Sequence, residues 1–295
     1  MSLSPLPAHA PFEQDPHLKR LFSALSEMGS VLVCYSGGVD SAFVLAAAHR
    51  VLGAGAVGMT AVSPSLPSFE REAAIDIARQ IGARHELVAS SEIEDDNYRK
   101  NDIDRCFHCK SELYRLSSKK KVDWSLQWVV NGTNLDDLGD YRPGLEAAKN
   151  AEVRSVLVEC GFRKEDVRRG AELLGLPIWN KPASACLSSR IPYGTEVTRE
   201  RLAQIDGLEG ELHRLGLDQV RVRWHALGST RDTTPGAIAR IEVDSRELMK
   251  AFEMRDAIVE AGKRCGFRYV TLDLQGYRTG SHNEVLVGRS LRVVS

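Results

Sequence analysis

The stretch SGGVDS, residues 36–41, decides the fold of this chain. It follows VLVCY (31–35), a short apolar run that is typical of a buried strand. It precedes SAFVLAAAHRVLG (41–53), which has the composition of a helix ended by its last glycine. Adjacent glycines allow a tight turn whose N–H groups point inward, and a helix start adds unpaired amides and a positive dipole end. The stretch therefore predicts an anion-binding loop between a strand and a helix.

The polar side chains of this stretch fit a phosphate site. Ser36 and Ser41 supply hydroxyl donors, and Asp40 could hold a Mg²⁺ ion that binds the phosphates. The loop is not a Walker loop, because G-x-x-x-x-G-K-[ST] occurs nowhere in the chain. The alternative is a serine–glycine turn that only caps a helix.

A second glycine pattern, GAGAVG (53–58), has the spacing of a dinucleotide-binding loop. It lies after a predicted helix and before a predicted strand, which is the reverse of the context that such a loop requires. We interpret it as a helix end followed by a loop, which argues against a nicotinamide enzyme.

Strand and helix patterns alternate along the first two thirds of the chain. This alternation predicts an α/β fold, a parallel sheet with helices on both faces. After about Thr195 the pattern changes to half-buried strands, QVRVRWH (219–225) and GAIARIEV (236–243), mixed with helices. We expect a flexible lead-in over residues 1–16, an α/β domain over 17–194 and a smaller α+β domain for substrate binding or oligomerisation over 195–295.

Composition narrows the classes of partner. The chain has 39 Lys and Arg against 40 Asp and Glu, a net charge of −1, so it lacks the basic footprint of a nucleic-acid-binding protein. No apolar run has the length of a membrane span, and the first residues lack the features of a signal peptide. We expect a cytoplasmic protein whose six cysteines are thiols or metal ligands.

A second polar loop, NGTNLDDLGDYRPGL (131–145), follows a later predicted strand. In open α/β sheets, ligands bind outside the carboxyl ends of the strands, so this loop should face the same crevice as residues 36–41. The alternative is an ordinary turn rich in Asn, Gly and Asp.

These two loops resemble motifs of the ATP pyrophosphatases, or PP-loop enzymes. S-G-G-V-D-S resembles their signature, and the second loop resembles their G-T-N-x-D-D element. The resemblance implies ATP and Mg²⁺ as ligands, with pyrophosphate released and the substrate adenylated. It implies that Asp40 binds Mg²⁺. The residues expected to bind ATP and its phosphates are Ser36, Gly37, Gly38, Asp40, Ser41, Gly132, Asn134 and Asp137.

Three further stretches identify a branch of this superfamily. DYRPGL (140–145), NKPASACLSSRIPYGT (180–195) and GFRYVTLDLQGYRTG (266–280) together resemble the LarE family, over nearly the whole chain. These sulfurtransferases make the organic part of the nickel-pincer nucleotide cofactor of lactate racemase. The resemblance implies an ATP-dependent enzyme that adenylates a carboxylate of pyridinium-3,5-biscarboxylic acid mononucleotide and converts it to a thiocarboxylate. It also implies a homo-oligomer.

Other adenylating functions remain as alternatives. An RNA thiolase would bind RNA with a steep salt dependence, which the near-neutral charge argues against. An amidating synthetase needs a source of ammonia, and we find no glutaminase in the chain. An adenine-nucleotide sensor or a zinc-stabilised scaffold without chemistry is the alternative outside the enzymes.

The source of sulfur is where this sequence departs from the best-known LarE pattern. That pattern, A-S-C-S-x-S-S-R, carries a sacrificial cysteine, but here Ala185 stands at its position and Cys186 follows. Cys106 and Cys109 form a Cys-x-x-Cys pair elsewhere in the chain. A second form of the family resembles this arrangement and implies that Cys106, Cys109 and Cys186 are catalytic and hold a [4Fe–4S] cluster. An external sulfide source would then supply the sulfur.

The cysteine pair has competing interpretations. It could belong to a zinc site with His108 as a further ligand, form a redox disulfide, or consist of two buried thiols without chemistry. Cys186 could also donate its own sulfur. We expect Cys34, Cys160 and Cys265 to be packing residues, since they lie within strand and helix patterns.

Substrate binding is expected from two stretches near and beyond the domain boundary. Strand alternation places Arg221 and Arg223 on one face, where two guanidinium groups could grip a phosphate and a carboxylate. The alternative is a solvated strand face paired with Arg240 and Glu242. With the family resemblance, the residues expected to bind substrate are Lys181, Ser188, Ser189, Arg190, Arg221, Arg223 and Glu242.

Overall fold

The computed structural model describes residues 15–139, 143–182, 184–227 and 236–278, which belong to two compact units. The first unit is Met1–Ser184 and the second is Ala185–Ser295. The second unit thus begins ten residues before the expected boundary at Thr195. Most of the expected lead-in and parts of all three family stretches (140–142, 183 and 279–280) lie outside the described residues. Within the described residues, none of the helices has the length and apolar character needed to cross a membrane.

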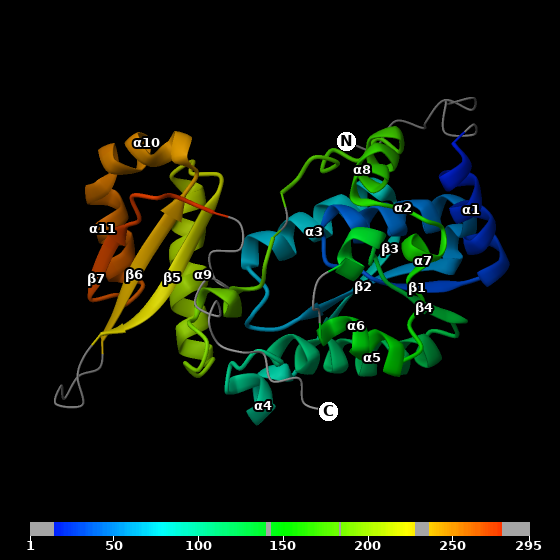
Figure 1. The fold of residues 1–295 in the computed structure, drawn as a ribbon, viewed down its shortest axis with the longest axis horizontal. Coiled ribbons are helices and arrows are strands. Elements are labelled where there is room, and N and C mark those ends of the chain that lie inside the picture. Colours follow the sequence, from blue (N-terminus) through cyan, green and yellow to red (C-terminus); the bar gives the residue numbers. More distant parts are fainter. Residues whose placement is uncertain (1–14, 140–142, 183, 228–235, 279–295) are drawn as a thin grey trace. The chain divides into compact units, whose positions relative to one another are not determined.

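The first unit contains a four-stranded parallel sheet with the strand order β3-β2-β1-β4. The strands are β1 Val31–Cys34, β2 Ala56–Val62, β3 Arg84–Ala89 and β4 Trp128–Val130. The helices of this unit are α1 Pro16–Met28, α2 Val39–Leu52, α3 Ser68–Ile81, α4 Asp96–Arg99, α5 Arg105–Asp123, α6 Pro143–Asn150, α7 Val156–Glu159 and α8 Lys164–Leu173 (Figure 1).

Two hydrophobic layers sandwich this sheet, because successive residues of a strand point to opposite faces. Val31 and Val33 of β1 pack into the layer formed with α1, α2, α3, α7 and α8. Leu32 and Cys34 pack into the layer formed with α5 and α6. Figure 1 shows these two sets of helices on opposite sides of the sheet. The predicted α/β fold, a parallel sheet with helices on both faces, is confirmed.

The order of the strands determines where a ligand can bind. The chain runs from β1 outward through β2 to β3 and then returns to place β4 on the other side of β1. The direction of winding therefore reverses between β1 and β4, and the loops after these strands leave the same edge of the sheet. Such a switch point is where open α/β sheets bind their ligands.

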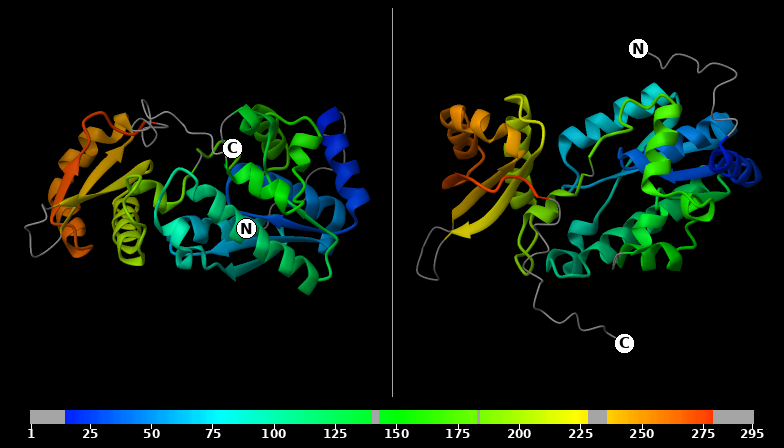
Figure 2. Two further views of the ribbon diagram at one scale, coloured as in Figure 1. Left: turned by 60° about the horizontal axis from the view of Figure 1, so that its bottom comes forward. Right: turned by 45° about the horizontal axis from the view of Figure 1, so that its top comes forward.

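The second unit is an α+β unit with a three-stranded sheet in the order β5-β6-β7. Strand β6 pairs antiparallel with β5 and parallel with β7, which forms an edge of the sheet (Figure 2). The helices and strands of the second unit are α9 Arg199–Arg214, β5 Val220–Leu227, β6 Gly236–Val243, α10 Leu248–Glu253, α11 Arg255–Arg264 and β7 Tyr269–Leu272. The sequence predicts one helix over residues 246–266, and this is wrong, because two helices meet there at Met254.

Candidate functional site

The loop after β1, residues 36–41, is held by its own serines, and we call it the Ser36 loop. The Ser41 hydroxyl accepts a hydrogen bond from the Ser36 N–H and donates one to the Gly38 carbonyl, both at 3.1 Å. The Gly38 N–H donates to the Ser36 hydroxyl at 3.4 Å. Because α2 begins at Val39, its first amides have no acceptor within the helix. This arrangement can bind an anion such as a phosphate.

Gly37 has to be glycine for two reasons. Its φ of +78° lies in the left-handed region, which side chains other than glycine rarely adopt. A Cβ atom at this position would also lie 2.7 Å from the Cβ of Ala74 on α3. The loop therefore approaches α3 closely enough to exclude any side chain.

The loop after β4, residues 131–139, lies directly against the Ser36 loop, and we call it the Asn131 loop. A Cβ at Gly132 would lie 2.8 Å from the Ser41 amide nitrogen and 2.9 Å from the Asp40 carbonyl carbon. The Asn134 side-chain amide donates to Asp40 Oδ1 at 3.3 Å. Asp137 accepts from the Asn134 backbone N–H at 3.1 Å and so holds the turn. The structure thus brings together the two loops that the sequence predicts to face one crevice.

A third segment joins these loops, and the sequence reasoning missed it. The Lys164 ammonium at the start of α8 lies 2.5 Å from Asp40 Oδ2. Asp136 of the Asn131 loop accepts from the Lys164 backbone N–H at 2.7 Å and from Arg163 Nη1 at 2.9 Å. These bonds lower the pKa of Asp136, chiefly through the Lys164 N–H. A sequence separation of 124 residues between Lys164 and Asp40 leaves no local pattern that could predict the pair.

Lys181, one of the expected substrate-binding residues, is paired within the first unit. Its ammonium lies 2.5 Å from Glu70 Oε2 of α3. Glu70 is only 6% exposed, so its carboxylate is a buried partner that fixes the position of the lysine. Glu70 is a second residue that the sequence reasoning missed.

The Cys-x-x-Cys pair lies in the first turn of α5. Cys106 is exposed and Cys109 is partly exposed, and neither is in a disulfide. Between them, His108 lies 3.3 Å from Asp95 and 3.5 Å from Asp104. Within either unit, the described residues contain no group of three or more His, Cys, Asp or Glu side chains that could hold a metal ion. The zinc and cluster interpretations both also use Cys186, which belongs to the second unit, so both stay predictions.

Lys110 follows the pair directly along α5 and is coupled to it electrostatically. Burial opposes the charge of its ammonium, but interactions with Tyr114, Cys109 and Cys34 raise the pKa of Lys110, and the net shift is upward. The charge state of Lys110 is therefore linked to that of the thiols around it. Lys110 is a third residue that the sequence reasoning did not single out.

The remaining three cysteines have the environment of packing residues, as predicted. Burial raises the pKa of Cys34 and of Cys160, and both lie in the hydrophobic core. Burial also raises the pKa of Cys265, which is partly exposed. Neutral thiols are poor nucleophiles and poor metal ligands.

In the second unit, Arg190 fixes the turn that carries Cys186. It donates to both oxygens of Glu209, at 2.9 and 3.1 Å, and to the carbonyls of Ala185 and Cys186 at 2.7 and 3.0 Å. Arg190 is 1% exposed and Glu209 is fully buried. In this structure Arg190 binds backbone carbonyls, and its expected contact with a phosphate stays a prediction. Glu209, which also accepts from the Val222 N–H at 2.9 Å, is a further residue missed by the sequence reasoning.

Neighbouring side chains extend this network. Ser188 is fully buried, and the Ser189 hydroxyl donates to the Cys186 carbonyl at 2.8 Å. The Ser189 carbonyl in turn accepts from Arg223 Nη1 at 3.0 Å. The turn that carries Cys186 is therefore bound to strand β5.

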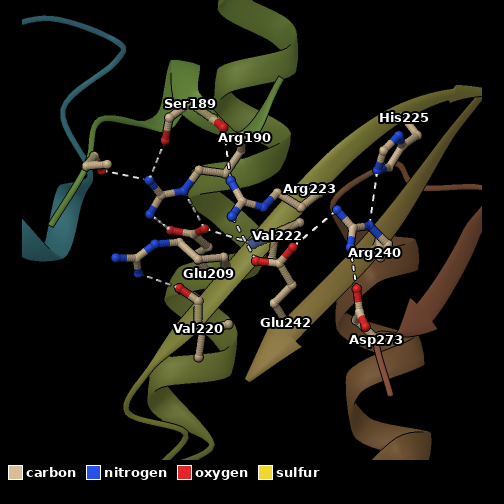
Figure 3. A network of polar contacts seen from close by, with 12 residues as sticks. Ser189, Arg190, Glu209, Val220, Val222, Arg223, His225, Arg240, Glu242 and Asp273 are labelled. Atoms are coloured by element: carbon tan, nitrogen blue, oxygen red, sulfur yellow. Dashed lines mark hydrogen bonds and ion pairs between the residues drawn. The ribbon is translucent and has the colours of Figure 1, made fainter. Parts of the chain in front are cut away.

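The arginines of β5 are buried, so the interpretation of a solvated strand face is wrong. Arg221 is 6% exposed and Arg223 is 7% exposed. Arg223 forms an ion pair with Glu242 at 2.8 Å (Figure 3). Burial, and then the positive charge of Arg190, lower the pKa of Arg221. Arg190, Arg221 and Arg223 thus place three buried guanidinium groups in this part of the second unit.

Comparison with known proteins places the chain among relatives that match it over most of their length. No family model matches the chain. It is 43% identical to an uncharacterised protein of Synechocystis over 91% of this chain and 97% of that protein. It is 28% identical to an uncharacterised protein of Methanocaldococcus jannaschii over 84% of this chain and 91% of that protein.

A third relative has a named activity. The chain is 36% identical to the pyridinium-3,5-bisthiocarboxylic acid mononucleotide synthase of Lactiplantibacillus plantarum, over 92% of this chain and 95% of that enzyme. Identity at this level over nearly the full length of both chains includes both units described above. The chain therefore belongs to the LarE family of pyridinium-3,5-bisthiocarboxylic acid mononucleotide synthases.

Proposed function

We propose that this protein is an ATP-dependent sulfurtransferase that converts a carboxylate of pyridinium-3,5-biscarboxylic acid mononucleotide into a thiocarboxylate. The name of the Lactiplantibacillus relative supports the sulfur-transfer role. The observation that supports dependence on ATP is the contact of the Asn131 loop and α8 with Asp40 of the Ser36 loop. Its product would be an intermediate of nickel-pincer nucleotide biosynthesis.

The chemistry needs ATP because a carboxylate is a poor electrophile. A carboxylate oxygen of the substrate attacks the α-phosphorus of ATP, and pyrophosphate leaves. A sulfur nucleophile then attacks the activated carbonyl carbon, and AMP leaves with that oxygen. The amides and hydroxyls of the Ser36 loop would bind the phosphates of ATP, with Asp40 as a ligand of Mg²⁺.

For the sulfur we propose a [4Fe–4S] cluster held by Cys106, Cys109 and Cys186. Cys106 is exposed and Cys109 is partly exposed near the start of α5, with Lys110 beside them, which supports this role for the first two cysteines. Arg190 holds the turn that presents Cys186. When bound, a cluster with three protein ligands supplies one iron position at which external sulfide can bind.

The buried arginines of the second unit would bind the substrate. Arg221 and Arg223 are buried guanidinium groups on one strand, and guanidinium groups are suited to binding the phosphate and the two carboxylates of such a nucleotide. Donation of the Cys186 sulfur itself is the second candidate, because this thiol is partly exposed on a fixed turn.

Anaerobic turnover with ATP, Mg²⁺, sulfide and the biscarboxylic acid mononucleotide tests the proposal. We expect pyrophosphate release that depends on the substrate, and several thiocarboxylate products per protein chain by mass spectrometry. Cluster absorbance should be present in the wild type and absent from Cys106→Ala, Cys109→Ala and Cys186→Ala.

Other outcomes would identify the alternatives. Product limited to one per chain, with sulfur lost from Cys186, would establish sacrificial donation. Pyrophosphate release that requires an RNA in place of the mononucleotide would establish an RNA thiolase. No pyrophosphate release with any substrate would contradict the ATP-dependent function.

A further inference from the structure

Lys164 occupies the side of Asp40 that a divalent cation would need. Its ammonium is 2.5 Å from Asp40 Oδ2, and the Asn134 amide donates to the other oxygen at 3.3 Å. Mg²⁺ binds carboxylate oxygens at about 2.0–2.1 Å and keeps a full octahedral shell. An ammonium group and Mg²⁺ therefore cannot share Asp40 Oδ2 in this arrangement, and one has to displace the other.

The backbone of Lys164 is fixed by the fold, whereas its side chain is partly exposed and, among the described residues, is held only at its ammonium end. The Lys164 N–H donates to Asp136 at 2.7 Å, and α8 packs tightly on α2. A Cβ at Gly170 of α8 would lie 2.6 Å from Cζ of Phe43, so the two helices approach closely. The lysine side chain is 35% exposed, and its four-carbon stem can move the ammonium without moving the helix.

We propose that Lys164 is a phosphate-binding residue that takes the place of the cation at Asp40 when no nucleotide is bound. This inference rests on the proposed use of ATP and Mg²⁺. When Mg–ATP binds, Mg²⁺ takes the Asp40 carboxylate and the Lys164 ammonium turns to the phosphate oxygens. There it balances the negative charge that builds up on the leaving pyrophosphate. No covalent bond to Lys164 forms, and its proton stays on the ammonium.

The exchange has a consequence that can be measured without turnover. In the nucleotide-free protein, the ammonium competes with any divalent cation for Asp40. Removal of the positive charge should therefore strengthen cation binding in the absence of ATP. A lysine that only supported the fold would not have this effect.

Mn²⁺ binding to the full-length protein without nucleotide, followed by electron paramagnetic resonance, tests the competition. We expect Lys164→Met to bind Mn²⁺ several-fold more tightly than the wild type, and Asp40→Asn to bind it more weakly than either. Lys19→Met is the matched control, since Lys19 is exposed on α1, and it should bind like the wild type. Equal Mn²⁺ affinity of Lys164→Met and wild type, or no binding by either, would overturn the inference.

Turnover then separates this inference from the proposed function. We expect Lys164→Met to release pyrophosphate more slowly by on the order of 10²-fold, the usual effect of removing one such donor. If the wild type and Lys164→Met released pyrophosphate at the same rate, the role of Lys164 would be contradicted and the proposed function would not. Wild type that releases none contradicts the proposed use of ATP. Lys164→Gln provides a second uncharged variant should Lys164→Met fold poorly.

Discussion

Glycine positions, more than charged ones, determine how closely the two loops of the site approach. Gly132 has no room for a side chain because the backbone of Asp40 and Ser41 occupies that space. Backbone at the start of a buried helix cannot shift as the end of a flexible side chain can. The absence of a Cβ at Gly132 is therefore what allows the Asn131 loop to reach Asp40.

Gly132→Ala should separate the two loops. We expect a loss of about 1–3 kcal/mol in the free energy of unfolding, the usual cost of overpacking, together with weaker ATP binding. Denaturant unfolding and calorimetry measure the two effects. Gly139→Ala is the control from the same loop, since a Cβ there meets nothing within 4 Å. If Gly139→Ala lost as much stability and ATP affinity as Gly132→Ala, the close approach at Gly132 would not be the cause.

Glu209→Gln tests the buried ion pair beneath Cys186. The change leaves the Arg190 charge buried without its carboxylate, which should cost about 3–5 kcal/mol of stability. Glu211→Gln on the same helix is the control. Glu211 pairs with Arg214 at the surface, where an ion pair contributes about 0–1 kcal/mol. Equal loss in the two variants, measured by denaturant unfolding, would show that burial of the pair has no special weight.

The sequence predicts strands and helices best where the pattern that indicates them is local. The run at 31–35, the polar loop after it and the helix after the loop all lie where their residues predict, because a buried strand and a capped helix are local properties. The break between α10 and α11 at Met254 was missed, since no Gly or Pro marks it. In the candidate site, adjacency of the two loops was predicted because both follow strands of a parallel sheet, and the strand order that sets β4 beside β1 came from the structure. Lys164, Glu70 and Glu209 were not predictable, because their partners lie far away in the sequence.

The pairing of β5 with β6 contains a pH-sensitive contact. Arg240 Nε donates to His225 Nε2 at 3.3 Å, so the imidazole accepts and is neutral there. Burial, and then the charges of Arg240 and Arg223, lower the pKa of His225, and Glu242 opposes them. The imidazole of His225 therefore takes up its proton at a lower pH in the folded chain than in the unfolded chain. Stability from this residue is fully present above the unfolded pKa of about 6.5 and is lost as pH falls toward the folded value.

We therefore expect the melting temperature to fall between pH 7 and pH 5, and to fall less in His225→Gln. The glutamine can still accept from Arg240 but does not titrate. A histidine NMR titration should also give His225 a pKa below its ordinary value. The same pH dependence in wild type and His225→Gln would exclude His225 as the source.

Across the whole molecule, binding of nucleotide should act on three distant segments at once. If Asp40 joins the Ser36 loop, the Asn131 loop and the start of α8, then Mg–ATP should slow hydrogen exchange in all three together. At a concentration of 100 Kd, the ligand should stabilise the protein by about 2.7 kcal/mol. Asp40→Asn should lose both effects. Protection limited to the Ser36 loop would show that the three segments are not coupled.

The distance along the chain between Asp40 and its partners also bears on how the protein is made. Asn134 and Lys164 follow Asp40 by 94 and 124 residues. During synthesis, Asp40 is added 94 residues before Asn134 and 124 residues before Lys164, so its carboxylate lacks both partners until those segments have been made. Closing such a loop costs entropy before any contact compensates it. A ribosome-bound chain that stops before α8 can carry the whole SGGVDS stretch and still lack the Lys164 partner of Asp40.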